Sequence, residues 1–292
     1  MYVDYLWALP SFLNPSTTLQ AYRSPGSPDE PAKLRLARTT TETSPENVPM
    51  TASRKMTVEI WSDVICPFCY IGKRKFERAL AQLPSRDQIE VIWRSFQLAP
   101  DTRTDPTRNA VQNLAEKKGW TLEVTRQAIT DISNRAQQVG LAFDYDRTVV
   151  ANTFDAHRLA HYAATQGKGD EMHERLFQAY FSDGHNIADH TVLTTLAVAI
   201  GLPADEAKHV LSSGQFTADV QRDLDQAAQF GINAVPFFVF NHKYAVSGAQ
   251  DSAILLQALQ QSLAEWTGAA AASSPQPPAA AGDVCDPQGN RD

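Results

Sequence analysis

The chain has 292 residues, a formal net charge of −7 and only three cysteines. The acidic balance argues against a nucleic-acid partner, because proteins that bind nucleic acids present basic surfaces. So few cysteines argue against a small fold held together by disulfides and fit a reducing compartment, so we expect a cytoplasmic protein. No stretch approaches the roughly 18 apolar residues of a membrane span, and no membrane partner is expected.

Residues 1–55 are expected to form a disordered N-terminal extension, because polar and proline-broken stretches dominate it and bury no core. The short apolar run at residues 5–10 is not interpreted as a signal peptide. Asp4 precedes it, Pro10 interrupts it, and neither a basic segment nor a cleavage site accompanies it. The candidate translation starts are Met1, Met50 and Met56.

A strand, a helix and a second strand are expected next, over residues 57–63, 66–83 and 89–96. Both strands are short apolar runs, and the stretch between them has helical spacing. Strands joined by such a crossover helix lie parallel in one sheet. This βαβ unit is the first half of an α/β domain.

The motif Cys66-Pro67-Phe68-Cys69 lies where the first strand meets the first helix. A cysteine at a helix N-terminus faces unpaired N–H groups and the positive end of the helix dipole, which favour the nucleophilic thiolate. Cys69, on the same helix face, can form a disulfide with Cys66. We expect an exposed Cys66 and a buried Cys69. A zinc site would need more ligands, and Cys285 is the only other cysteine, so a redox pair is favoured over zinc or an inert buried pair.

Residues 105–230 are expected to form a helical insertion, since their apolar spacing is helical and cap-like residues such as Thr121 mark helix starts. His157 and His161 lie one helical turn apart and, with Asp155, are a candidate metal set. No further ligand is evident, so buried or cleft-lining histidines are favoured and no metal is expected.

The last part of the chain is expected to hold two strands at 237–240 and 244–247, joined by a tight turn, and a helix at 251–266. The full order is therefore βαβ, helices, ββα. Residues 268–292 are rich in Ala, Pro and Gly and are expected to be a flexible tail. This tail carries Cys285 and is long enough to reach the other cysteines.

The order of elements and four separated motifs resemble the DsbA family of thioredoxin-fold proteins, and within it the FrnE-type branch. The motifs are WSDVICPFCYIGK at 61–73, NTFDAHRL at 152–159, LFQAYF at 176–181 and GINAVPFFVF at 231–240. The resemblance implies an α/β thioredoxin-like fold whose two halves, 56–104 and 231–267, flank a large all-helical insertion at 105–230.

Carried over to these motifs, the resemblance makes Cys66 the attacking cysteine, Cys69 the resolving one and Pro236 a cis-proline facing them. A cis bond there would leave the backbone of Val235 free to pair with an extended substrate, whereas a trans proline would simply start a strand. Further candidates for substrate contact are Pro67, Phe68 and His157.

Other residues of these motifs have more than one interpretation. Asp63 is a candidate acceptor for the proton that Cys69 loses when it attacks a mixed disulfide, or else a strand-end or solvated aspartate. The basic residues at 73–75 are candidates for steering substrates, but a solvated helix face is favoured. Cys285 is either an auxiliary thiol or a dispensable one.

The favoured function is that of a thiol–disulfide oxidoreductase, an oxidase or isomerase of protein or small-molecule disulfides. It would need no cofactor, although glutathione is a candidate co-substrate. Because Phe68 cannot supply the imidazole found between the cysteines of DsbA, we expect a weaker oxidant than DsbA. One alternative is a glutathione-dependent enzyme similar to kappa-class glutathione transferases or 2-hydroxychromene-2-carboxylate isomerases, which have serine where Cys66 stands. The other is a redox-inert biosynthetic accessory protein.

Overall fold

The computed structural model describes residues 20–21 and 55–272 of the chain. Five strands form one sheet in the order β1-β7-β6-β2-β3. Their bounds are β1 Gln20–Ala21, β2 Met56–Ser62, β3 Ile89–Ser95, β6 Phe237–Phe240 and β7 Tyr244–Ser247. Strand β2 lies parallel to β3 and antiparallel to β6, and β7 pairs antiparallel with both β6 and β1. The expected βαβ unit is therefore present.

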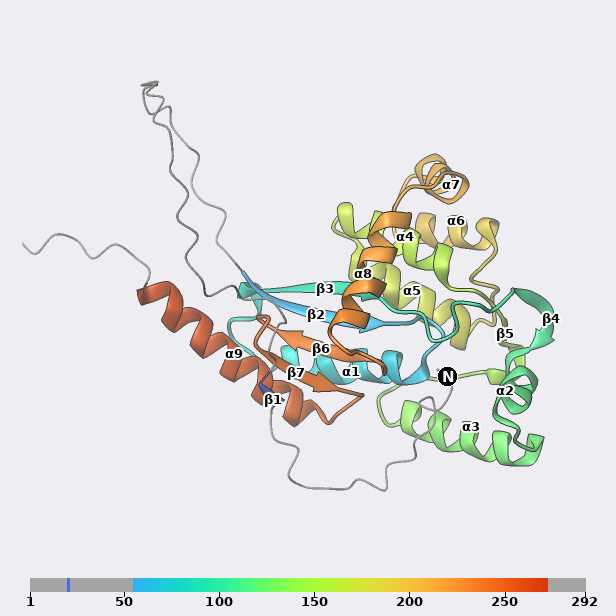
Figure 1. Cartoon of the computed structure of the whole chain (residues 1–292), viewed down its shortest axis with the longest axis horizontal. Coiled ribbons are helices and arrows are strands. Elements are labelled where there is room, and N and C mark those ends of the chain that lie inside the picture. The colour runs from blue at the N-terminus through green and yellow to red at the C-terminus, as the bar shows by residue number, and fades with distance from the viewer. Residues whose placement is uncertain (1–19, 22–54, 273–292) are drawn as a thin grey trace, which may run out of the picture.

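Two helices cover one face of this sheet. Helix α1, Pro67–Leu80, connects β2 to β3, and α9, Ser252–Ala272, follows β7 and contacts α1 (Figure 1). Apolar side chains that alternate along the strands pack against both helices, as the period of two along a strand requires. This core includes Met56, Ile60, Phe76, Phe238, Phe240 and Leu259.

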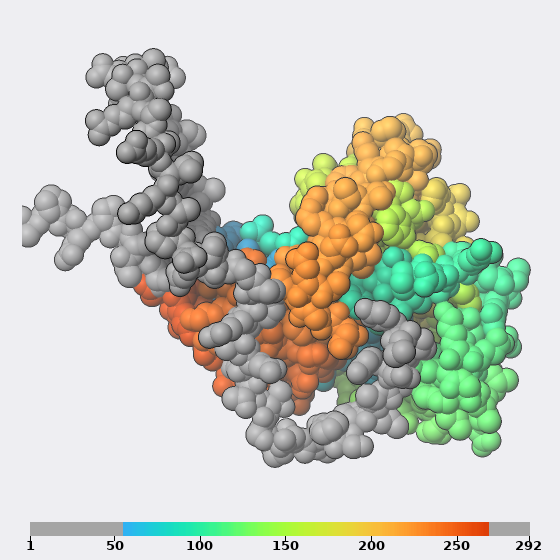
Figure 2. Space-filling model, viewed as in Figure 1, coloured from blue at the N-terminus to red at the C-terminus, as the bar shows by residue number. Residues whose placement is uncertain are grey.

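A long insertion separates β3 from β6, as the sequence predicts. Its elements are β4 Asp105–Asn109, α2 Ala110–Lys118, α3 Leu122–Gln137, β5 Val149–Val150, α4 Phe154–Thr165, α5 Gly169–Phe181, α6 His190–Ala199, α7 Ala204–Ser212 and α8 Thr217–Gln229. Figure 2 shows α7 and α8, in orange, running down the viewed face, with α2 and α3, in green, beside them. The insertion is helical apart from the antiparallel pair β4–β5, which the sequence analysis did not predict.

The insertion and the sheet meet at the C-terminal end of β2. Helices α3 and α5 contact α1, and α8 contacts β3. Their apolar side chains form a second core, which contains both Cys66 and Cys69 together with Trp61, Leu159 and Phe177. The cysteine pair is thus enclosed between the two parts of the molecule.

Two elements extend beyond the expected boundaries. Residues Gln20–Ala21 pair with β7 although they fall in the predicted disordered extension, and α9 continues to Ala272, into the predicted tail. Apart from Lys55, the other residues of both predicted segments lie outside the described part of the chain. Among the described helices, none is long and apolar enough to cross a membrane.

Candidate active site

A tight turn links the end of β2 to the start of α1. The carbonyl oxygen of Asp63 accepts the N–H of Cys66 at 2.9 Å. Helix α1 then begins at Pro67, so Cys66 is its N-cap residue. Proline suits this first position because it has no N–H to leave unpaired. Cys66 therefore lies at the positive end of the helix dipole, as the motif predicts.

Both cysteines of the motif are free thiols, and each residue is only 1% exposed. The expectation of an exposed Cys66 is therefore wrong. Its thiol donates to the carbonyl oxygen of Val235, 3.7 Å from the sulfur, and both residues belong to the core that the insertion forms. The Val235–Pro236 peptide bond is cis.

Cys69 is held in its neutral form. Burial is the main reason why the pKa of its thiol lies well above the ordinary value, and the hydrogen bond and charge of Cys66 raise it further. The Ser62 hydroxyl and the Asp63 backbone amide act in the opposite direction, more weakly. Because the charge of Cys66 is one of these causes, Cys69 becomes easier to ionise once the Cys66 sulfur is bound in a disulfide.

Helix α1 and the proline loop are in close contact. A Cβ atom added to Gly72 would lie 2.8 Å from Cγ of Pro236 and 3.5 Å from the ring of Phe238. Only glycine allows this approach without a shift of the neighbours. Gly72 thereby fixes the distance between the helix that carries Cys66 and the loop that faces its sulfur.

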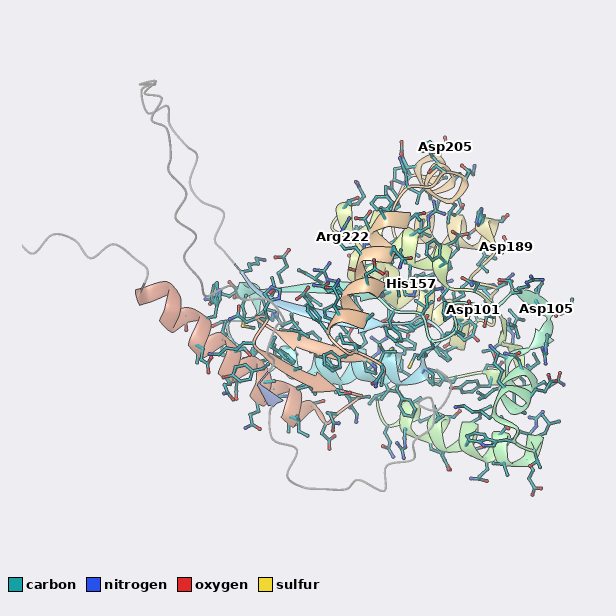
Figure 3. The ribbon with its side chains drawn as sticks, viewed as in Figure 1. Asp101, Asp105, His157, Asp189, Asp205 and Arg222 are labelled. Atoms are coloured by element: carbon teal, nitrogen blue, oxygen red, sulfur yellow. The ribbon has the colours of Figure 1, made fainter. Side chains whose placement is uncertain are left out.

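Asp63 and His157 form a buried pair beside the turn. Figure 3 labels His157, which belongs to α4. The two side chains are 0% and 1% exposed, with Oδ1 of Asp63 3.4 Å from Nε2 of His157. The distance fits an ion pair, but the groups are not aligned for a hydrogen bond. The other carboxylate oxygen accepts the N–H of Leu98 at 2.8 Å. Asp63 is thus neither solvated nor a simple cap, and His157 is buried rather than on an open substrate cleft.

Buried polar atoms without an aligned partner gather at this junction. Within the described residues seven such side-chain atoms occur, and five of them belong to Ser62, Asp63, Tyr145 and His157. Unpaired buried polar groups are rare in native proteins and cluster where function requires them. The sequence analysis did not identify Ser62 or Tyr145, because neither lies in a spacing typical of catalytic residues.

Lys73 does not belong to a solvated helix face, as the sequence analysis expected. It is 2% exposed and pairs with Glu77, Asp170 and Glu174. Arg74 also pairs with Glu174, and the hydroxyl of Tyr70 donates to the same carboxylate at 2.6 Å. Acidic side chains of α5 therefore form ion pairs with the basic side chains of α1, and these pairs hold the helix against the insertion.

The candidate metal set is not assembled. His157 faces Asp63, His161 lies 3.0 Å from Oδ2 of Asp223, and Asp155 pairs with Arg158 and His190. Within the described part of the chain, no three His, Cys, Asp or Glu side chains are arranged to hold an ion.

Two cavities flank the junction. One, of about 450 Å³, lies along β3 next to α4 and α5, and neither cysteine lines it. The other, of about 340 Å³, lies between α2, α3 and the segment around Tyr145, whose side chain lines it with those of Arg126, Ser133 and Phe143.

The remaining candidates from the sequence can now be placed. Pro67 is buried in the first turn of α1, and Phe68 is half-buried against the core that contains the cysteines. Pro67 adjoins Cys66 in the chain, and Phe68 adjoins Cys69. Cys285 lies outside the described residues.

Residues 57–260 match the family model of the DSBA-like thioredoxin domain, so the chain belongs to this family. Among curated proteins, the uncharacterized protein YwbO of Bacillus subtilis (strain 168) is 31% identical over 185 residues, which cover 62% of this chain and 85% of that protein.

Among solved structures, a probable DsbA oxidoreductase from Streptomyces coelicolor shares 36% identity and a TM-score of 0.66, covering 80% of this chain and 97% of that one. A 2-hydroxychromene-2-carboxylate isomerase shares the fold, with 17% identity and a TM-score of 0.52 over 75% of this chain and the whole of that one. The comparisons establish the thioredoxin-like fold with its inserted helices.

Proposed function

We propose that this protein is a thiol–disulfide oxidoreductase that exchanges disulfides through Cys66 and Cys69. The observation that carries the proposal is the placement of the two thiols. Cys66 caps the N-terminus of α1 and faces the loop of Val235 and Pro236, while Cys69 lies behind it with a raised pKa. Cys66 is thus placed to attack a substrate disulfide, and Cys69 stays a neutral thiol until the second step. The family and the similar oxidoreductase from Streptomyces coelicolor support the same assignment.

The reaction has two steps. The Cys66 thiolate attacks one sulfur of a substrate disulfide, forms a mixed disulfide and releases the other substrate sulfur as a thiolate, which takes up a proton. Cys69 then loses its proton and attacks the Cys66 sulfur, which releases the second substrate thiol and leaves a Cys66–Cys69 disulfide. Two electrons pass from the protein to the substrate. The reverse sequence oxidises a substrate dithiol.

The raised pKa of Cys69 determines the order of these two steps. While Cys66 is free, its charge opposes ionisation of Cys69, so Cys69 does not compete for the substrate. The mixed disulfide removes that charge, which lowers the barrier to the second attack. Asp63 fits a role as proton acceptor through its position, because its backbone contacts Cys66 and acts on Cys69.

Substrates would bind across the loop of Val235 and Pro236, which faces Cys66, with Pro67 and Phe68 next to the cysteines in the chain. We propose disulfide- or thiol-bearing proteins or small molecules, glutathione included, as partners, and the cytoplasm as the compartment. The fold shared with the isomerase does not by itself favour glutathione-dependent isomerisation, because the chain has a cysteine pair suited to redox exchange.

Reduction of insulin by dithiothreitol, followed by turbidity, tests the proposal. The wild-type protein should accelerate the reaction, and Cys66→Ser should abolish the acceleration. A wild-type protein without effect would favour a redox-inert accessory protein instead, and a Cys66→Ser variant as active as the wild type would show that Cys66 does not carry the exchange.

A further inference from the structure

Strand β3 forms one outer edge of the five-stranded sheet, and among the described strands it pairs only with β2 (Figure 1). Its sequence, IEVIWRS, is rich in β-branched and aromatic residues, which favour extended backbone. Proline residues and bulges are two common ways in which proteins protect an edge strand. β3 contains no proline, and its register with β2 is regular over all seven residues. It therefore keeps an edge to which another strand can be added.

The backbone groups of Val91 and Trp93 point to this free edge. Successive residues of a strand direct their N–H groups to opposite sides. The N–H of Phe96 donates to the last residue of β2 at 3.0 Å, and the N–H of Ser95 donates on the other side, to Oδ2 of Asp223 at 2.8 Å. Trp93 and Val91, two and four residues before Ser95, share its direction. At an exposed edge such groups bind water, which a peptide strand can replace.

The cavity of about 450 Å³ runs along the same edge. Six successive residues of β3, 90–95, line it. Because side chains alternate between the two faces of a sheet, a cavity that touches all six follows the backbone edge rather than either face. Six residues of a strand span about 17 Å, so the cavity has the shape of an extended chain. The opposite wall contains small residues of α4 and of the turn to α5, which are Ala160, Ala164, Gly167 and Gly169.

Negative charge prevails around this cavity. Glu90 and Glu171 line it with exposed carboxylates, whereas burial lowers the pKa of His173 to about 3, so that this histidine adds no charge at neutral pH. Two networks of ion pairs at its wall each hold one carboxylate more than they hold cations, when histidines are counted as neutral. They are Lys73 and Arg74 with Glu77, Asp170 and Glu174, and Arg94 with Glu59 and Asp223.

These charges favour a basic occupant over a second copy of the chain. The chain has a net charge of −7, and two copies that met along β3 would bring Glu90 and Glu171 of one against an acidic surface of the other. Like charges so placed oppose association. A positively charged segment gains from the same field.

We propose that the cavity along β3 is a docking site for an extended, basic segment of a partner protein, which adds a strand to the sheet at Val91 and Trp93. Backbone hydrogen bonds hold the segment, and its lysine or arginine side chains lie near Glu90 and Glu171. Neither cysteine lines the cavity, so a partner can dock there without occupying the cysteine pair. The site goes beyond the proposed disulfide exchange and does not depend on it.

Six-residue peptides labelled with fluorescein test the site, with binding to the full-length protein followed by fluorescence anisotropy. One peptide alternates lysine and valine, and a control peptide alternates glutamate and valine. Two further lysine peptides carry N-methyl groups, one on every lysine and the other on every valine. In a strand only one of these two sets turns its N–H groups toward β3. One methylated peptide should therefore keep its affinity, and the other should lose about tenfold, as should the glutamate peptide.

A pair of charge variants locates the basic side chains of the bound peptide. Glu90→Gln combined with Glu171→Gln removes two carboxylates from the cavity. Glu116→Gln combined with Asp205→Asn is the control, because it changes the net charge equally at two side chains, 67% and 99% exposed, that do not line the cavity. Figure 3 labels Asp205, on α7. The first double variant should bind the lysine peptide about three- to tenfold more weakly, and the control should bind it as the wild type does.

Hydrogen exchange followed by mass spectrometry locates the added strand. A saturating concentration of the lysine peptide should slow exchange of the amides at 89–95 and leave those of the central strand β6 unchanged. Unchanged exchange along β3, equal binding of the two methylated peptides, or equal weakening in both double variants would overturn the proposal. A stable dimer that the peptide dissociates would also overturn it, because a second copy would then fill the cavity. No thiol takes part, so failure here is distinct from failure in the insulin assay.

Discussion

Gly72 and Pro236 touch across the active site, and a Cβ on Gly72 would lie 2.8 Å from Cγ of the proline ring. The ring is rigid and cannot turn aside as a long side chain would. Residues far apart in the chain therefore set the width of the gap between α1 and the loop that faces Cys66.

Replacing Gly72 with alanine should disturb both stability and exchange. Alanine is favoured over glycine inside a helix by about 1 kcal/mol, but overpacking typically costs about 1–3 kcal/mol. We expect a net loss of stability in urea unfolding and slower insulin reduction, because the loop must move away from the sulfur. Gly214→Ala is the control, since nothing lies within 4 Å of a Cβ there. A Gly72→Ala variant that is more stable and fully active would show that the contact is unimportant.

The two cysteines should differ in reactivity although they are equally buried. Each is 1% exposed, so access alone predicts similar rates. Because burial and Cys66 raise the pKa of Cys69, we expect iodoacetamide at neutral pH to label Cys66 far faster than Cys69. Peptide mapping by mass spectrometry measures both sites in one sample. In Cys66→Ser, Cys69 should label somewhat faster than in the wild type, since part of the rise in its pKa disappears. Faster labelling of Cys69 than of Cys66 in the wild type would reverse the assigned roles.

The buried pair of Asp63 and His157 should contribute to stability. His157→Ala leaves the buried Asp63 carboxylate with the N–H of Leu98 but without a charged partner among the described residues, and loss of such a partner costs about 3 kcal/mol in comparable cases. In the double variant with Asp63→Asn the loss should be smaller than the sum of the single losses, because the charge that needs a partner is gone. Unfolding in urea gives the free energy of unfolding of the wild type, the two single variants and the double variant, which together form a double-mutant cycle.

His161→Ala is the matched control for that cycle, from one turn further along α4. It also removes a histidine from a carboxylate, but Asp223 keeps Arg94 and the N–H of Ser95 as partners. Its effect should therefore be smaller. The pair of Asp63 and His157 would contribute no stability of its own if two results were found together. These are equal losses of stability for His157→Ala and His161→Ala, and effects of His157→Ala and Asp63→Asn that simply add in the double variant.

Glu174 should make the protein sensitive to acid. Burial raises the pKa of its carboxyl, but hydrogen bonds from Tyr70 and Arg74 and the charge of Lys73 outweigh this, so the pKa lies below the ordinary 4.5. A carboxyl whose pKa is lower in the folded state stabilises the protein at pH values above its unfolded-state pKa. This stabilisation is lost as the pH falls through the folded-state pKa. Glu174→Gln should be less stable than the wild type at neutral pH. The difference in stability between the two proteins should narrow below about pH 4.5.

Thermal melts between neutral pH and pH 3 measure the difference in stability between Glu174→Gln and the wild type. Glu171→Gln serves as control, because the Glu171 side chain is 49% exposed and pairs only with Lys168 at 3.4 Å among the described residues. A gap for Glu174→Gln that stays constant between neutral pH and pH 3 would contradict the assigned shift.

Local signals in the sequence located the main parts of the site. The junction at Cys66 and the strands on either side of the 241–243 turn follow from patterns that span a few residues, and these patterns also predict the order of the elements. The resemblance to a known family added the cis bond at Pro236.

Contacts between distant segments could not be predicted in this way. Lys73 looks like a surface residue because its carboxylate partners on α5 are nearly one hundred positions away. Tyr145 begins a short 3-10 helix with no recognisable motif, and only the structure shows that its hydroxyl is buried without an aligned partner among the described residues. The exposure of Cys66 was misjudged for the same reason, since the groups that enclose it come from the insertion and the proline loop.

Trapping the mixed disulfide tests the central claim most directly. Full-length Cys69→Ser is mixed with excess glutathione disulfide, and intact and peptide masses are recorded alongside the wild type. The account predicts a stable glutathione adduct on Cys66 in the variant, and in the wild type a Cys66–Cys69 disulfide with no lasting adduct, because Cys69 resolves it. Adducts confined to Cys285, or a stable Cys66 adduct in the wild type, would contradict it.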